Sequence, residues 1–325
     1  MARFRRLARI PAWRKLALAT WHSPSNPTAY GVLDLDCERA LLWVERARAA
    51  SGERITLTHL VGKAAALAIA SAPETNGFAS FGRLLLRETV DVFFQVAFFE
   101  PGRDGLDAPD APDAPGAPDA PGAPTAAEAR REAGLAGAKI SRADQRTVVE
   151  IARELGRRAS AIRERGDDPT VRSSRMLARV PGPVRALAAR LGAFLSFDLG
   201  WNLTGLGVPF DPFGSCMVTN VGVFGIESAW APLIPYARTP MCITLGAVRM
   251  APSVVAGQIV ARRRVAIGVA FDHRVMDGYH AGRMARRFQD VFADPESALG
   301  EPDQCTSPTS SANDPTSTSS GDAPP

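Results

Sequence analysis

The sequence predicts an α+β fold in which helices cover one mixed β-sheet. Short apolar runs rich in Val, Ile and Phe fill the C-terminal third and are separated by Gly, Pro and Arg, which is typical of strands. Helical segments lie mainly before these runs and do not alternate regularly with them, so a repeated β-α architecture is not expected. Hydrophobic residues make up 46% of the 325 residues, which is ample for a core.

Three helices are expected before the strand-rich part. The first has Asp36 as its N-cap and stops at Gly52. The second is nearly apolar all round, so it should be buried; it starts from a Thr58 cap and ends before Pro73. The third follows Ser141, which opens an S-x-x-D capping box. Further along, a shorter apolar helix is expected near residue 183.

The strands are predicted from β-type runs with alternating side chains. Residues 83–99, RLLLRETVDVFFQVAFF, predict a strand or a hairpin, and four runs follow between 215 and 272. In the last run, large residues alternate with Ala266, Gly268 and Ala270, so one face should meet a core and the other a crowded layer. Residues 279–295 then predict a helix.

Composition divides the chain into an arm, a folded body and a tail. Residues 1–27 form a basic N-terminal arm, and 28–300 form the body. An insertion over 101–134 contains the Ala-Pro-Asp/Gly triplets of 107–125, whose prolines remove amide donors and prevent helix formation. Residues 301–325 are rich in Ser, Thr and Pro, and we expect both the insertion and this tail to be disordered.

The charge of the chain is concentrated in the arm. The net charge is +4, yet the first 33 residues hold six cations and no acid: Arg3, Arg5, Arg6, Arg9, Arg14 and Lys15. A solvated arm is the simplest interpretation; an anionic membrane surface, a partner protein or a transit-like segment are the alternatives. No nucleic-acid motif accompanies these residues, so no nucleic-acid partner is expected. No apolar run is long enough to span a membrane.

The cysteines indicate free thiols in a reducing compartment. Cys37, Cys216, Cys242 and Cys305 are far apart, and three of them lie in apolar segments. No His and Cys share ligand spacing, so no metal site is expected. The prediction for the location is the cytoplasm.

The stretch FDHRVMDGYHAGRM, residues 271–284, carries the candidate chemistry. His273 directly follows a buried strand, where partial loss of solvent favours the neutral imidazole that a general base requires. Asp277 is near enough in sequence to pair with it or to orient the loop. Taken alone, such a pair is more often structural than catalytic. His280 is interpreted as a packing or surface residue at a helix N-terminus.

Several segments resemble one known family. FDHRVMDG closely resembles the H-x-x-x-D-G signature of the acyltransferase core of 2-oxo-acid dehydrogenase complexes, and DGYHAG looks like the version in chloramphenicol acetyltransferase, which shares the fold. SCMVTNVG is similar to the family's T-I-S-N-[LIV]-G segment, and THLVGKAAALAIASAPETNG resembles one of its helices. The resemblance covers roughly residues 28–100 and 135–298, and its motifs are most specific in the C-terminal third.

The resemblance implies a chloramphenicol acetyltransferase-like two-layer sandwich and a coenzyme A-dependent acyltransferase, with coenzyme A as substrate. His273 would take the proton from the coenzyme A thiol, and Thr219, at the serine position of T-I-S-N, would donate to the oxyanion. Asp277 would brace the loop through an ion pair with an arginine. The family's trimers, with active sites between subunits, imply a homotrimer here in which His273 faces its neighbour.

The sequence departs from the family in two ways. No lipoyl domain with a lysine on a hairpin is recognised, so we expect either a lipoyl group supplied in trans as thiol acceptor or another acyl donor or acceptor. The family's proline-containing GLvvPvikdad segment is GLAGAKISRAD here, near the substrate channel. Two alternatives therefore stay open: a chloramphenicol-type O-acetyltransferase, and a non-catalytic trimeric scaffold or membrane-associated assembly protein.

Overall fold

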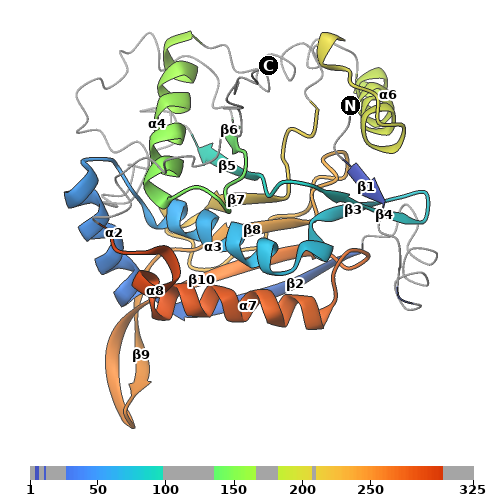
Figure 1. Ribbon diagram of the computed structural model, residues 1–325. Coiled ribbons are helices and arrows are strands. Elements are labelled where there is room, and N and C mark those ends of the chain that lie inside the picture. The colour runs from blue at the N-terminus through green and yellow to red at the C-terminus, as the bar shows by residue number, and fades with distance from the viewer. Residues whose placement is uncertain are drawn as a thin grey trace, which may run out of the picture.

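The computed structural model has one large mixed sheet with helices packed against one face (Figure 1). It describes these parts of the chain: residues 4–6, 11, 27–97, 135–165, 182–206 and 210–302. The predicted disorder of the insertion 101–134, and of the tail beyond 302, lies outside the described residues. The α+β prediction is confirmed.

The central sheet has the strand order β2-β10-β8-β7-β5-β6, with β9 paired to the first half of β10. The β7 pairings with β5 and β8 are parallel, and the other pairings are antiparallel, so the sheet is mixed as predicted. Figure 1 shows the β9–β10 hairpin projecting beyond the body. The strands are β2 (Thr28–Asp36), β5 (Val92–Ala97), β6 (Leu135–Ile140), β7 (Cys216–Asn220), β8 (Met241–Leu245), β9 (Arg249–Val255) and β10 (Gln258–Asp272).

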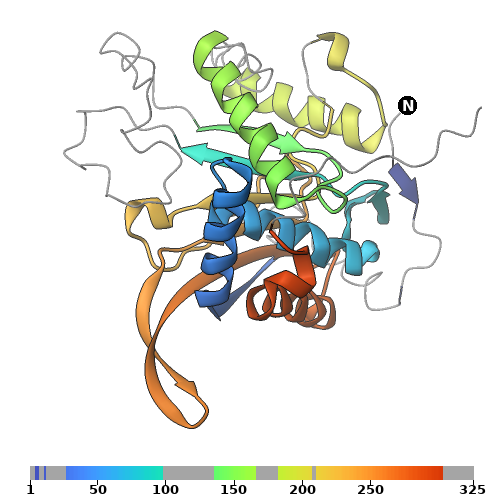
Figure 2. The same ribbon diagram turned by 60° about the vertical axis from the view of Figure 1, so that its left-hand side comes forward.

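Helices cover one face of this sheet and share one hydrophobic core with it (Figure 2). They are α2 (Glu38–Ser51), α3 (Leu57–Ser71), α4 (Val148–Arg165), α7 (Gly278–Ala293) and the short α8 (Pro295–Leu299). Val265, Ile267 and Phe271 of β10 point into that core, which confirms the predicted large-residue face. Burying such aliphatic and aromatic side chains stabilises the fold by about 1.5–3 kcal/mol each.

Among the described residues, loops cover the opposite face of the sheet, and glycines in the strands let these loops pack closely. A side chain at Gly246 would overlap the carbonyl of Glu227, and one at Gly268 would overlap the carbonyl of Ala229. The loop that follows the short η4 (Gly222–Phe224) therefore lies directly on the strands. This confirms the crowded layer predicted from the alternation in β10.

A second, three-stranded sheet has the order β1-β4-β3. The predicted strand or hairpin over 83–99 is in fact two strands in different sheets, because β4 pairs with β1 and β3 while β5 joins the central sheet. Its strands are β1 (Phe4–Arg6), β3 (Gly77–Ser80) and β4 (Arg83–Arg87). Part of the basic arm is thus tied to the body by β1. The short η1 (Pro73–Thr75) leads into β3.

The apolar helix expected near residue 183 is present as α6 (Gly182–Ala193), which continues into η2 (Phe194–Asp198) and is followed by η3 (Thr204–Leu206). A buried ion pair ties the chain after it to the body: Arg87 donates from Nε and Nη2 to the two carboxylate oxygens of Asp211, at 2.8 and 2.9 Å. The Arg87 charge holds the pKa of Asp211 low although burial opposes this.

Two predicted helix caps are wrong, and the third is displaced. Helix α3 is capped by Thr56, whose partner in a capping box is His59; Thr58 lies inside the helix. Helix α4 is capped by Thr147 in a box with Glu150, and Ser141 lies in the turn before it.

The first helix begins one residue later than Asp36 predicts. Cys37 is the residue at the N-cap position, and the Asp36 carboxylate accepts a hydrogen bond from the Glu38 N–H at 3.0 Å. The stop at Gly52 is confirmed, because this glycine closes α2 with a φ of 69° in the left-handed region.

Candidate active site

His273 lies in a tight turn between the end of β10 and the start of α7. Its backbone N–H donates to the Pro27 carbonyl at 2.9 Å, and its ring stacks on Phe271 with the centroids 6.3 Å apart. The Asp272 carboxylate accepts from the backbone and guanidinium of Arg274 at 2.8–3.0 Å. The two residues that flank His273 thus clamp each other, and the half-buried imidazole is held on a rigid support.

Asp277 is the N-cap of α7, where it accepts a hydrogen bond from the His280 N–H at 3.1 Å. The same carboxylate oxygen contacts Nδ1 of the His280 ring. In the same turn Arg274 pairs with Asp272 at 2.8 Å. Asp277 starts the helix that follows His273, and its ion pair with an arginine and its support of the loop stay predictions.

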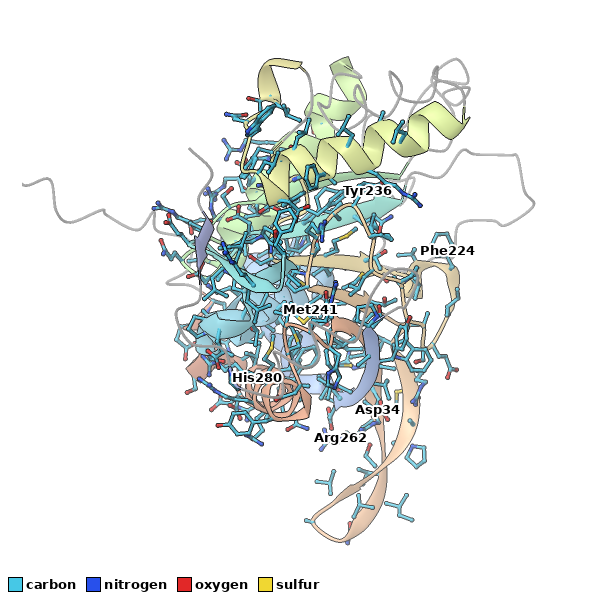
Figure 3. All side chains as sticks on the ribbon, turned by 90° about the vertical axis from the view of Figure 1, so that its right-hand side faces the viewer. Asp34, Phe224, Tyr236, Met241, Arg262 and His280 are labelled. Carbon is cyan, nitrogen blue, oxygen red and sulfur yellow. The ribbon has the colours of Figure 1, made fainter. Side chains whose placement is uncertain are left out.

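His280 takes a larger part in this arrangement than its sequence suggests. It lies on α7, where a helix N-terminal packing residue was predicted (Figure 3). Besides its contact with Asp277, its Nε2 lies 3.7 Å from the Glu74 carboxylate, which also pairs with Arg283 at 3.1 Å. The i, i+3 spacing of Asp277 and His280 was the available signal, because this spacing joins an N-cap to the first helical turn.

Thr219 occupies the second-to-last position of β7 and is half-buried. Among the residues that the structure describes, its hydroxyl has no hydrogen-bond partner. Asn220 fixes the strand end, since its amide donates to the Thr58 hydroxyl at 3.0 Å and its carbonyl oxygen accepts from the Gly222 N–H at 2.9 Å. Sequence reasoning missed Asn220, although it directly follows Thr219 in the motif.

The strand register places Thr219 far from His273 within one chain. Thr219 is paired with Thr244 of β8, and Thr244 is paired with Gly268 of β10. His273 lies five residues beyond Gly268, which corresponds to about 16 Å along the strands, and two strand spacings add about 10 Å across them. Phe224, just after β7, and His280, just after the His273 turn, lie on opposite sides of the molecule (Figure 3). One chain therefore does not bring the two residues together.

The cysteines do not offer an alternative nucleophile in the described part of the chain. Cys37, Cys216 and Cys242 are free and buried, as predicted, and Cys305 lies outside the described residues. Burial raises the pKa of Cys37 and of Cys242 to about 12, and it raises the pKa of Cys216 as well. These thiols stay protonated near neutral pH and are poor nucleophiles. No cluster of metal-binding side chains occurs among the residues described.

The part of the chain that holds Thr219 and the His273 turn is similar to known proteins. Residues 213–300 match the family model of the 2-oxoacid dehydrogenases acyltransferase (catalytic domain). Over 88 residues the chain is 34% identical to a dihydrolipoyllysine-residue succinyltransferase of the mitochondrial 2-oxoglutarate dehydrogenase complex of Arabidopsis thaliana; this covers 26% of the chain and 18% of that protein. The corresponding Saccharomyces cerevisiae protein is 32% identical over 86 residues, with 26% and 18% covered. The aligned part is thus under a fifth of these relatives' length.

Solved structures share the fold over most of the chain. A probable dihydrolipoamide acetyltransferase from Listeria monocytogenes superposes with a TM-score of 0.53 and 14% identity, covering 91% of this chain and 96% of the other. The dihydrolipoamide acetyltransferase of Azotobacter vinelandii superposes with a TM-score of 0.53 and 18% identity, covering 90% of this chain and 94% of the other. A serine, a histidine and an asparagine of that enzyme were investigated for their role in its catalytic mechanism.

The chain shares the fold of these acyltransferase cores, and its residues 213–300 match the family model of the 2-oxoacid dehydrogenase acyltransferase catalytic domain. Both the His273 turn and Thr219 lie inside that segment.

Proposed function

We propose that the protein is a coenzyme A-dependent acyltransferase that moves an acyl group between coenzyme A and a thiol of the dihydrolipoyl type. The observation that carries the proposal is the His273 turn: the histidine is clamped between Asp272 and Arg274 and lies inside the segment that matches the acyltransferase catalytic domain. The relatives matched there are dihydrolipoyllysine-residue succinyltransferases, so succinyl and acetyl groups are the first acyl groups to test.

In this proposal His273 acts as general base. Its neutral imidazole accepts the proton of the coenzyme A thiol, and the thiolate attacks the carbonyl carbon of the acyl thioester. The tetrahedral intermediate carries a negative oxygen, to which the Thr219 hydroxyl donates a hydrogen bond. The intermediate collapses with expulsion of the dihydrolipoyl thiolate, which takes the proton back from the imidazolium. The reverse direction uses the same groups. Asp277 positions the turn and transfers no proton.

The distance between His273 and Thr219 leads us to propose that two copies of the chain complete each site, in a homotrimer. Exposed apolar side chains on the sheet support this, because monomers seldom leave such groups in water. Tyr30 and Val32 of the edge strand β2 are about half exposed, and Trp230 beside them is also exposed while its indole N–H donates to the Gly31 carbonyl at 2.8 Å. A cyclic trimer that covers this surface could bring His273 of one copy to Thr219 of the next.

We further propose that the lipoyl group is supplied in trans by another protein. The matched relatives are dihydrolipoyllysine-residue succinyltransferase components of 2-oxoglutarate dehydrogenase complexes. A cytoplasmic location remains a prediction, consistent with the free thiols of Cys37, Cys216 and Cys242.

The test is direct measurement of acyl transfer by the full chain. Acetyl- and succinyl-coenzyme A would each be incubated with dihydrolipoamide, and the acylated acceptor would be quantified by chromatography. His273→Ala should lower the rate by a factor of about 10² to 10⁴, the usual contribution of a general base. His59→Gln is the matched control: it removes a buried imidazole elsewhere and should leave the rate unchanged.

Three other outcomes would contradict the proposal. Transfer that is unaffected by His273→Ala would remove the histidine from the mechanism. Transfer to hydroxyl acceptors such as chloramphenicol, with none to dithiols, would instead favour the O-acetyltransferase alternative. A folded trimer that releases no coenzyme A with thiol, hydroxyl or amine acceptors would favour a non-catalytic scaffold.

A further inference from the structure

We infer that the protein docks on an anionic lipid bilayer through one face of α6. This α6 face consists of Phe81, Leu187, Arg190, Leu191 and Phe194. Apart from Phe81, these residues lie within 163–210, the part of the chain that the family resemblance leaves unexplained, and docking through them does not depend on the proposed acyl transfer. Figure 2 shows α6 on the outside of the molecule, away from α3 and α7.

The apolar part of the α6 face is a row on the helix. Leu187, Leu191 and Phe194 follow at spacings of four and three residues, so they lie on one side of it. They are 65%, 51% and 38% exposed, and the Phe194 ring meets the ring of Phe81 edge-on with the centroids 6.0 Å apart. An apolar row that faces water on a short helix is the pattern of a helix that lies in the membrane interface.

Phe81 gives a second observation that points the same way. It lies in the β3–β4 turn with a φ of 45°, a left-handed conformation that costs a bulky residue about 1–2 kcal/mol relative to glycine. Its ring is nevertheless 68% exposed, so burial within the chain does not compensate for this cost. An aromatic ring held outward in a strained turn suits insertion between lipid headgroups.

The charge around the α6 face is positive. Arg190 is exposed in the last turn of α6. Arg83, at the start of β4, is exposed as well. Strand β1 of the basic arm pairs with β4 opposite residues 85–87, so part of the arm belongs to the same small sheet as the Phe81 turn. Cations near an anionic bilayer strengthen binding to it.

The nearest acid does not offset this charge. Asp198 is occupied by Arg238, whose Nη2 donates to it at 2.9 Å, and by the Ser80 hydroxyl, which donates at 2.7 Å. A second copy of the chain would fit the α6 face poorly, because two identical positively charged faces would repel each other across a twofold interface. No helix of the described residues could cross a membrane, so binding would be peripheral.

The experiment is cosedimentation of the full chain with vesicles. Vesicles of phosphatidylcholine containing phosphatidylglycerol should pellet the protein at low salt, and vesicles of phosphatidylcholine alone should not. Leu187→Ser combined with Leu191→Ser should weaken the partition at least about tenfold, since two large apolar side chains no longer enter the interface. Arg190→Glu should weaken it about tenfold and reduce its salt dependence.

The matched control is Val254→Ser combined with Ile259→Ser, which removes two apolar side chains of greater exposure, 73% and 79%, from the β9–β10 hairpin. This control should bind vesicles like the unchanged chain. The inference is overturned if the unchanged chain does not bind anionic vesicles, if it binds both vesicle types equally, or if the two double variants behave alike. Size-exclusion chromatography adds one more arm: dissociation of an oligomer by the α6 double variant would show that a second copy covers this face.

Discussion

Within one chain, Thr219 lies near one end of the central strands, and His273 lies beyond their other end. Thr219 is in register with Thr244 and, through it, with Gly268, whereas His273 lies five residues further along, beyond the end of β10. Neither side chain is long enough to close a separation of about 16 Å along the strands and about 10 Å across them. A site that uses both residues therefore needs two copies of the chain, and this requirement is the centre of our account.

Replacing Asp277 by alanine should destabilise the protein by about 1 kcal/mol, because the N-cap of α7 is lost. Asp277→Asn is the control, since asparagine is an equally good N-cap. Urea unfolding of both variants measures the difference. If the role of Asp277 is to cap α7 and hold the His273 turn, the asparagine variant keeps both stability and acyl transfer. Equal destabilisation by the two changes would show that the charge facing His280 matters more.

Thr147→Ala should cost about 1 kcal/mol of unfolding free energy, and Ser141→Ala should cost almost nothing. Thr147 exchanges hydrogen bonds with Glu150 at 2.8–3.2 Å, which makes it the true start of α4. Ser141 lies in the preceding turn. Thermal or urea unfolding separates the two variants. The reverse ranking would contradict the helix start in the structure.

His59 should make the protein less stable in mild acid. Burial, with smaller contributions from Arg48 and Arg54, lowers the pKa of His59 to about 4, against 6.5 for the free side chain. As pH falls below 6.5 the unfolded state takes up a proton that the folded state refuses, so stability present above that pH is lost down to pH 4. At pH 5 the loss is on the order of 2 kcal/mol relative to pH 7.

The control for this prediction is His59→Gln. Glutamine can accept the hydrogen bond of the Thr56 N–H, so it keeps the capping box of α3 without a titrating group. Urea midpoints at pH 7 and pH 5 should therefore differ less for this variant than for the unchanged chain. The same acid sensitivity in both proteins would assign the effect to other groups.

Asp211→Ala should cost about 3–5 kcal/mol, because it leaves the buried Arg87 guanidinium without its carboxylate. The control is Glu154→Ala, which breaks the more exposed pairs with Arg157 and Arg158 and should cost less than about 1 kcal/mol. Denaturant unfolding measures both. Comparable small losses would mean that water reaches Arg87 when its partner is removed.

The parts of the fold that local pattern determines could be predicted from the sequence. The alternation in β10 predicted its two faces correctly, and the glycine that stops α2 was found. Caps were predicted less well, because several Ser and Thr residues precede each helix and only the hydrogen bonds select one. Thr58 illustrates this, since its hydroxyl accepts from Asn220 of a distant strand instead of capping α3.

The candidate site was predicted residue by residue but not as an arrangement. His273, Asp277 and Thr219 are recognisable from their motifs, whereas their mutual positions depend on strand order and register. Nothing local in the sequence indicates that β7 runs parallel to β8 while β10 runs antiparallel to it. The pair between Arg274 and Asp272, two residues apart, was not predicted, because the spacing alone does not show which carboxylate an arginine meets in space.

Complementation between two inactive variants tests the two-copy site most directly. His273→Ala and Thr219→Ala chains would each be assayed alone and then refolded or expressed together in equal amounts. Alone, each should fall to about 1% of the original acyl transfer or below. Each mixed trimer has one site in three with an intact His273 from one chain and an intact Thr219 from its neighbour; over all randomly assembled trimers this is about one site in four, so the mixture should recover about 25% of the activity. A mixture no more active than the average of the two single variants would contradict a site shared between copies.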